Sequence, residues 1–558
     1  MSISWLSGII SLIYRFLSRH TRVIALLFFA IIMLHIWRTL YIPSLDGPQH
    51  LYNANVIVQL LTGNDQFREF FRINPVIVGY WTGHFLLGFF KLMFPAWLTQ
   101  KLFLMTYVLG MFFSFRYLVN SLSPGKVNLM IYLIFPFIFH FYLALGYYTF
   151  SMAVIFYFWA MGYWIRKGET MSWKEMISFS ALAMGVFLSH GLVFLFFISS
   201  LFLYIVITRI NIFLHRGKPC LKSIFRQLWK TTVSLIPSLV LWAIYIRSVM
   251  VINSTVTPAE YSFRNQVVML IRIRQLVGFN HEVEAAPLKI LFILLVILGI
   301  TALILFIISH LPMNQGDRDI ELDGKIYAWT AISLLFLVAY LFLPDRISAG
   351  SLTHRFGLFF FFSLITLLAF QPIPKFIQIL TVLLLLGITW QARENQHHFM
   401  KALTSDIKDI RTMAPYMKDG STIVSLNASN NWIHIHFPLY VAVDKPLVHL
   451  NNPQCAGQFP IIWNEERLPE CLVGVDTYRP TDAPDVSGQG RSREQVDYIT
   501  VFFQKSFWDN KSNHYWHEIL NNHYQLVMTT PRELGALYQR IDSTKYEKDP
   551  VGDHSGLQ

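Results

Sequence analysis

Long apolar runs are the feature that most constrains the fold of this 558-residue chain. A run of about 18 to 20 apolar residues is long enough for a helix to cross the hydrocarbon core of a bilayer. Such runs lie at 23–41, 98–118, 127–144, 147–165, 175–190, 191–207, 231–252, 288–309, 326–343, 356–371 and 374–391. They predict an all-α polytopic membrane domain of about 11 transmembrane helices over residues 1–391.

The composition agrees with a membrane protein. Hydrophobic residues make up 54% of the chain and charged residues 14%, against roughly 25% charged in soluble domains. A disordered chain is therefore excluded and a soluble globular protein is disfavoured. The net charge of +12 would suggest nucleic acid in a soluble chain, but much of it lies in short loops between apolar runs, so we expect no nucleic-acid partner. Three cysteines exclude a disulfide scaffold.

The loop charges predict the orientation. A basic cluster before residue 23 indicates an uncleaved anchor with a cytoplasmic N-terminus. The basic loops at 116–126, 166–174 and 209–230 can all be cytoplasmic only if the further apolar run at 76–94 does not span. We therefore expect 76–94 to be an interfacial or re-entrant helix on the outer side, and the C-terminus to lie outside.

The chain becomes polar and rich in asparagine after the last apolar run. Alternating, strand-like runs occur at 422–426, 496–503, 524–528 and 536–540. They predict a small extracytoplasmic α/β domain over 392–542, followed by a disordered tail over 543–558. Cys455 and Cys471 both fall in this domain and either pair or stay free.

Asp46 directly follows the first apolar run, in the segment 43–53. A carboxylate at the membrane surface costs desolvation energy unless it is solvated, paired or used in chemistry. As a general base it could deprotonate an acceptor hydroxyl or amine. The alternative is a turn residue that caps the helix expected from Gln49. Both interpretations stay open.

This arrangement resembles the GT-C superfamily of polytopic glycosyltransferases, above all the aminoarabinose and protein-mannose transferases that use polyprenyl-phosphate sugars. Those enzymes open with one span and an outer loop that carries an acidic motif, to which residues 46–52 are similar, with Asp46 at the first acid. Residues 74–81, which include Tyr80 and Trp81, match in part the segment that leads into a non-spanning helix. Many members also end in an outer soluble domain.

This chain departs from the family pattern at three positions where the family has charged residues. Gly47 stands where the family has a second acid, Asn74 replaces a lysine, and the next outer turn, 145–149, has no acid. Two or three acids together would favour a divalent cation such as Mg or Mn. A lone Asp46 leaves two alternatives: arginine neutralises the donor phosphate, or the enzyme uses a weakly held metal.

The resemblance implies an arginine that grips the lipid-linked phosphate, and Arg355 matches that position. Arg346 and Arg72 are further candidates. The alternative for Arg355 is an interfacial side chain that snorkels to lipid headgroups. Arg272 and Arg274, on the amphipathic segment 262–277, either cover a cavity or rest on the bilayer.

Histidines add few candidates. His84 and His190 lie in or beside apolar helices and are read as packed side chains rather than catalysts. His434 and His436 alternate in an expected strand, which places both on one face. No third ligand lies at metal-site spacing, so a solvated face is favoured over a zinc site.

The resemblance implies an inverting transfer of sugar from a polyprenyl-phosphate donor to a lipid, glycan or protein acceptor. Asp46 would act as base or as ligand of acceptor or metal, and His50, Tyr52 and Tyr80 would line the site. A lipid-linked glycan flippase and a catalytically inactive GT-C-like scaffold are the alternatives. A bacterial inner membrane with a periplasmic active face is expected. A luminal active face in the endoplasmic reticulum would look similar.

Overall fold

The computed structural model describes residues 3–125, 128–216, 221–252, 262–311, 319–343, 352–455, 459–464, 466, 468, 496–510 and 513–541. The chain divides into two compact units. Unit 1 comprises Met1–Gly47 and Asn74–Thr404, and unit 2 comprises Pro48–Ile73 and Ser405–Gln558. The second unit therefore includes a stretch of the segment that follows the first apolar run, in addition to the polar C-terminal region.

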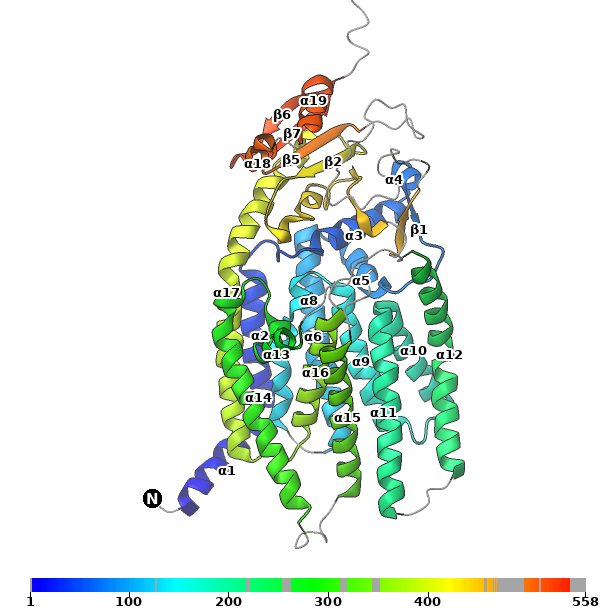
Figure 1. Cartoon of the computed structure of the whole chain (residues 1–558), viewed down its shortest axis with the longest axis vertical. Helices are drawn as coiled ribbons and strands as arrows, with labels where there is room; N and C mark the ends of the chain where they lie inside the picture. Colours follow the sequence, from blue (N-terminus) through cyan, green and yellow to red (C-terminus); the bar gives the residue numbers. More distant parts are fainter. Residues whose placement is uncertain are drawn as a thin grey trace, which may run out of the picture. The chain divides into compact units, whose positions relative to one another are not determined.

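Unit 1 is helical, and its long helices run side by side (Figure 1). In the described residues, seven helices are long and apolar enough to cross a membrane, or eight if the bent pair α1–α2 is one span. The main helices of this unit are α1 (Ile3–Arg19), α2 (Thr21–Trp37), α5 (Trp81–Lys91), α6 (Ala96–Leu122), α9 (Tyr148–Lys167), α10 (Trp173–Ser189), α11 (Gly191–Arg216), α12 (Leu221–Ile252), α14 (His281–Ser309), α15 (Ile320–Phe342), α16 (Leu352–Ala369) and α17 (Lys375–Arg411).

The difference from the predicted eleven spans has a local cause. The apolar run at 127–144 is not one helix but three short ones, η1 (Leu129–Ile134), α7 (Phe135–Ile138) and α8 (Phe141–Ala144). The backbone leaves helical geometry at Phe139 and is extended at His140. The helices α9 and α10 do form, but neither is among the seven.

Two shorter features concern the edges of the helical unit. Helix α5 has 11 residues, which is about 16 Å of helix and too short for a hydrocarbon core of about 30 Å. Its length is consistent with the expected non-spanning segment at 76–94. Helices α1 and α2 meet at an angle of 69°, so the amphipathic N-terminal helix departs from the direction of the first span.

Aromatic side chains and close backbone contacts form the core of unit 1. Phe28 of α2 stacks on Phe135 of α7 with ring centroids 4.3 Å apart. A Cβ atom at Gly162 would lie 2.9 Å from the Cα atom of Leu118. Helix α9 can therefore pack directly against the backbone of α6, because position 162 has no side chain.

Unit 2 contains a five-stranded mixed sheet in the order β3-β2-β5-β7-β6. Strand β2 pairs in parallel with β3 and β5, and β7 pairs antiparallel with β5 and β6. The four predicted strands are confirmed as β2 (Thr422–Asn427), β5 (Tyr498–Phe502), β6 (Tyr524–Thr529) and β7 (Gly535–Arg540). The other elements include α3 (Gly47–Leu61), α4 (Asp65–Phe70), α18 (Gln504–Asp509), α19 (His514–His523), β3 (Val448–His449), and the two-stranded pair of β1 (Phe71–Ile73) and β4 (Ile461–Trp463).

The predicted strand through His434 and His436 is wrong. Residues Trp432–His434 form the 3-10 helix η5, and a second one, η6 (Phe437–Val441), follows. The Asn431 side chain accepts the Ile433 N–H at the start of η5, and this local bond competes with extended backbone. The two histidines therefore do not share a strand face.

Candidate functional site

Asp46 lies in the loop after α2, and hydrogen bonds fix this loop to the turn before α9. The Asp46 N–H donates to the Leu145 carbonyl at 2.8 Å. The Gln100 side chain of α6 donates to the Ile42 carbonyl and to the Tyr148 hydroxyl, each at 2.8 Å. It also accepts the Ile42 N–H at 2.9 Å. The position of the Asp46 backbone is thus set by both neighbouring helices.

Two glycines allow this close approach. Gly146 has a φ of 86°, which favours glycine, and a Cβ atom there would lie 2.4 Å from the Gly47 nitrogen. A Cβ atom at Gly47 would lie 2.1 Å from Ser44 Oγ and 2.9 Å from the Tyr148 hydroxyl. A second acid at position 47 would therefore need both hydroxyl groups to move, which gives the departure from the family motif a structural reason.

The surroundings of Asp46 favour its neutral form. The side chain is only partly exposed, and burial raises the pKa of Asp46 from 3.8 to about 7. A carboxyl group with that pKa exchanges a proton readily near neutral pH. Asp46 also stands directly before α3, so the capping interpretation is compatible with the structure as well.

Arg355 lies in the first turn of α16 and is 5% exposed. Its guanidinium carbon is 5.4 Å from the Tyr142 ring, 5.7 Å from the Tyr147 ring and 5.6 Å from the Phe150 ring. Aromatic faces attract a cation without neutralising it. Tyr147 belongs to the same turn as Leu145, whose carbonyl accepts the Asp46 N–H, so this turn contacts both the Asp46 loop and the Arg355 guanidinium.

Tyr80 is connected to the rings around Arg355 through His190 and Phe150. Its hydroxyl is 3.1 Å from the Tyr245 hydroxyl of α12, and its ring lies edge-on to His190 at 5.2 Å. The His190 ring in turn contacts Phe150 at 5.4 Å. Tyr80 has a φ of 74°, an uncommon backbone geometry for a residue with a side chain, and its N–H donates to the Ser189 carbonyl.

Two more guanidinium groups lie over the stretch from Phe139 to Tyr147, which we call the aromatic segment. Arg274, in η2 (Arg274–Leu276), is 5.8 Å from the Phe141 ring, and Arg393 of α17 is 4.7 Å from the Phe139 ring. Arg393 is 6% exposed. Sequence reasoning missed it, because an arginine just after an apolar run is normally an interfacial anchor.

Three further predicted site residues fall in the other compact unit. His50, Tyr52 and Arg72 belong to unit 2. The Tyr52 hydroxyl donates to the Leu447 carbonyl at 2.9 Å and accepts the His449 N–H at 2.8 Å. Both hydrogen bonds of this hydroxyl therefore go to backbone groups of unit 2.

His50 is buried beside Phe459, with ring centroids 6.4 Å apart, and Arg72 is an exposed residue of β1. His84 packs with Nδ1 2.8 Å from the Tyr80 carbonyl oxygen. Arg346 falls outside the described residues.

The donor set does not fit a metal held by the protein alone. No group of three or more His, Cys, Asp or Glu side chains suited to a metal ion occurs in the part of the chain that the structure describes. A divalent cation at Asp46 would therefore need phosphate oxygens of the substrate as further ligands. Cys455 is a buried free thiol, and Cys471 lies outside the described residues.

Together these features define an integral membrane protein with a helical unit that carries a partly buried carboxyl group and three ring-bound guanidinium groups. No family model matches the chain, and no curated protein matches it. It is similar to the crystal structure of ArnT from Cupriavidus metallidurans in the apo state, with 11% identity, a TM-score of 0.45, and coverage of 93% of this chain and 98% of that one. The same protein bound to undecaprenyl phosphate has 11% identity, a TM-score of 0.41 and the same coverage.

Proposed function

We propose that the protein is a membrane glycosyltransferase that moves a sugar from a polyprenyl-phosphate donor to a lipid, glycan or protein acceptor. One observation carries the proposal: a single turn of unit 1 holds both groups, since its Leu145 carbonyl accepts the Asp46 N–H at 2.8 Å and its Tyr147 ring lies 5.7 Å from the Arg355 guanidinium carbon. A base and a phosphate-binding cation in one site are the two groups that such a transfer needs.

In the proposed step, an acceptor oxygen or nitrogen forms a bond to the anomeric carbon of the donor sugar. The bond between that carbon and the phosphate oxygen breaks, and the carrier phosphate leaves with the electron pair. Asp46 takes the proton that the acceptor releases. Attack opposite to the leaving phosphate inverts the anomeric configuration, and alignment of the two reactants supplies much of the rate enhancement.

The leaving phosphate gains negative charge, so cations should surround it. Arg355 can bind two phosphate oxygens with its planar guanidinium. Arg274 and Arg393 lie over rings of the same aromatic segment and would add positive charge along the path of the lipid phosphate. Tyr80 and His190 would line the side of the site next to Arg355.

Asp46→Asn tests the proposal. The amide keeps the size of the side chain but cannot accept the proton, so transfer should fall by about 10²- to 10⁴-fold. The measurement is release of polyprenyl phosphate from a panel of polyprenyl-phosphate sugars by the purified protein with membrane extract as acceptor. Asp65→Asn removes an almost fully exposed carboxylate and should leave the rate unchanged. Full activity of a folded Asp46→Asn protein would contradict the assigned role.

The same assay separates the alternatives. A flippase would move the lipid across a vesicle membrane without releasing the carrier phosphate, and a scaffold would do neither. We place the protein in a bacterial inner membrane, with a cytoplasmic N-terminus and unit 2 in the periplasm, on the loop charges and the resemblance given above.

A further inference from the structure

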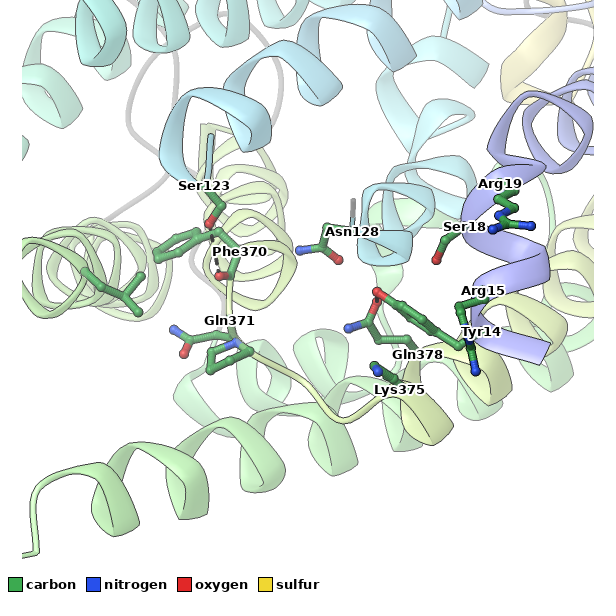
Figure 2. A pocket seen from close by; sticks show the side chains of 12 residues that line it. Tyr14, Arg15, Ser18, Arg19, Ser123, Asn128, Phe370, Gln371, Lys375 and Gln378 are labelled. Atoms are coloured by element: carbon green, nitrogen blue, oxygen red, sulfur yellow. Dashed lines mark hydrogen bonds between the residues drawn. The ribbon is translucent and has the colours of Figure 1, made fainter. Parts of the chain in front are cut away.

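A cavity of about 590 Å³ lies in unit 1 at the end of the helices remote from Asp46. Its walls come from the C-terminal half of α1, the residues that follow α6 and α16, and the first turns of α15 and α17. Figure 2 shows this arrangement, with Tyr14, Arg15, Ser18 and Arg19 on one helix. Pockets for small ligands have volumes of about 300 to 1,000 Å³.

The cavity is positively charged. Arg15, Arg19 and Lys375 line it, and none of its described lining residues is acidic. No ion pair joins these three cations to a carboxylate of the described residues. Lys375 Nζ lies 5.6 Å over the Tyr14 ring. The site therefore suits an anion.

Fixed polar groups complete the wall. Gln378 Oε1 accepts the Leu129 N–H at 3.2 Å, and its Nε2 donates to the Ile373 carbonyl at 2.7 Å. The Ser18 hydroxyl oxygen is buried and makes no hydrogen bond to any described residue, so it can donate to a ligand. Phe370 adds an apolar surface. Positive, polar and apolar walls together match a phosphate group that is attached to a hydrocarbon chain.

The position of the cavity separates it from the proposed donor site. Arg355 and Phe370 are 15 positions apart on and just after α16, which is about 22 Å of helix. Asp46 follows the end of α2, whereas Arg19 precedes its start. These lengths approach the hydrocarbon thickness of about 30 Å. The two sites therefore belong to opposite membrane surfaces, and the cavity faces the surface that the loop charges predict to be cytoplasmic.

We propose that this cavity binds the phosphate headgroup of an anionic phospholipid from that leaflet. The amphipathic helix α1 turns by 69° from α2, as expected for a helix that lies on the membrane surface. A lipid phosphate held between Arg15, Arg19 and Lys375 would fix α1 against the start of α17. The inference does not depend on the sugar-transfer activity.

Native mass spectrometry of the purified protein with phosphatidylglycerol or phosphatidylcholine tests the proposal. Wild type should retain phosphatidylglycerol in preference. The triple variant Arg15→Gln, Arg19→Gln, Lys375→Gln should lose about a hundredfold in affinity, because each cation near an anionic lipid contributes a factor of about five. The matched control is Lys174→Gln, Lys222→Gln, Arg226→Gln, which removes three exposed cations from the same predicted surface outside the cavity.

An equal loss of lipid affinity in both triple variants would overturn the proposal, because the affinity would then depend on the number of surface cations and not on the cavity. Inorganic phosphate that binds as tightly as phosphatidylglycerol, with the same dependence on the three cations, would assign the site to free phosphate instead. Ser18→Leu fills the cavity without changing the charge and should also weaken lipid binding. Unchanged binding in this variant would contradict the cavity as the site.

Discussion

At the residue scale, the candidate site brings ionisable side chains into a chain that is otherwise poor in charge. Asp46 is partly exposed and its pKa is raised by burial, while the Arg355 guanidinium is surrounded by aromatic rings. Sequence reasoning pointed to Asp46 because a carboxylate next to an apolar run costs desolvation energy, and to Arg355 through the resemblance to GT-C enzymes. It could not find the third partner, Tyr147, since one tyrosine among 25 carries no such signal.

The raised pKa of Asp46 predicts a pH dependence. Below pH 7 the carboxyl group is protonated and cannot accept a proton, so transfer should rise with pH and reach half of its maximum near pH 7. Because the folded pKa lies above 3.8, the contribution of Asp46 to stability is complete below about pH 4 and is lost as the pH rises through 7. Thermal unfolding of wild type should thus shift to lower temperature between about pH 4 and 7 relative to Asp46→Asn. A wild-type rate that is flat from pH 5 to 9 would exclude Asp46 as the base.

Arg355→Lys tests the geometry of phosphate binding. Lysine keeps the positive charge but loses the planar group that binds two oxygens and packs on three rings. We expect kcat/KM for the donor to fall by about 10- to 100-fold, which corresponds to the loss of one charge-assisted hydrogen bond. Arg68→Lys alters an exposed arginine and serves as control. Wild-type kinetics in the lysine variant would show that a positive charge alone is enough to bind the donor phosphate.

At the scale of single elements, the regular pieces were predictable and the irregular ones were not. Four of the five sheet strands follow an alternating pattern and are predicted within two residues at either end, whereas the two-residue strand β3 is too short to give a pattern. The apolar run at 127–144 and the two histidines at 434 and 436 were read as a span and a strand, but the chain makes short helices at both places. Their boundaries depend on tertiary contacts and local caps, which the periodicity of the sequence does not contain.

The turn at Gly146 is an element whose role can be measured. Gly146→Ala places a Cβ atom 2.4 Å from the Gly47 nitrogen at a φ of 86°, so the turn that fixes Asp46 must shift. We expect a loss of about 1 to 3 kcal/mol in stability and a larger fall in transfer than the loss of folded protein explains. Gly125→Ala is the matched control, since its φ is 78° and nothing lies within 4 Å. The idea fails if both variants lose the same stability and keep full activity.

At the scale of the whole molecule, the sequence predicted a helical membrane part and a small α/β part, and the structure contains both. The interruption of unit 1 by Pro48–Ile73 was not predicted. Nothing in the composition of this stretch marks it as part of a sheet-containing unit. Strand β1 has three residues and pairs with β4, some 390 positions later, a separation that sequence periodicity cannot bridge.

The orientation in the membrane is the prediction that concerns the whole chain. If the loop charges set it, Lys174 faces the cytoplasm and Arg72 faces outward; both side chains are exposed. In a background with Cys220→Ser and Cys471→Ser, a membrane-impermeant maleimide should label Arg72→Cys in intact spheroplasts and Lys174→Cys only after permeabilisation. The buried thiol of Cys455 should stay unlabelled and serves as internal control. Labelling of Lys174→Cys in intact spheroplasts would reverse the orientation, and the proposed donor site and the lipid cavity would then exchange leaflets.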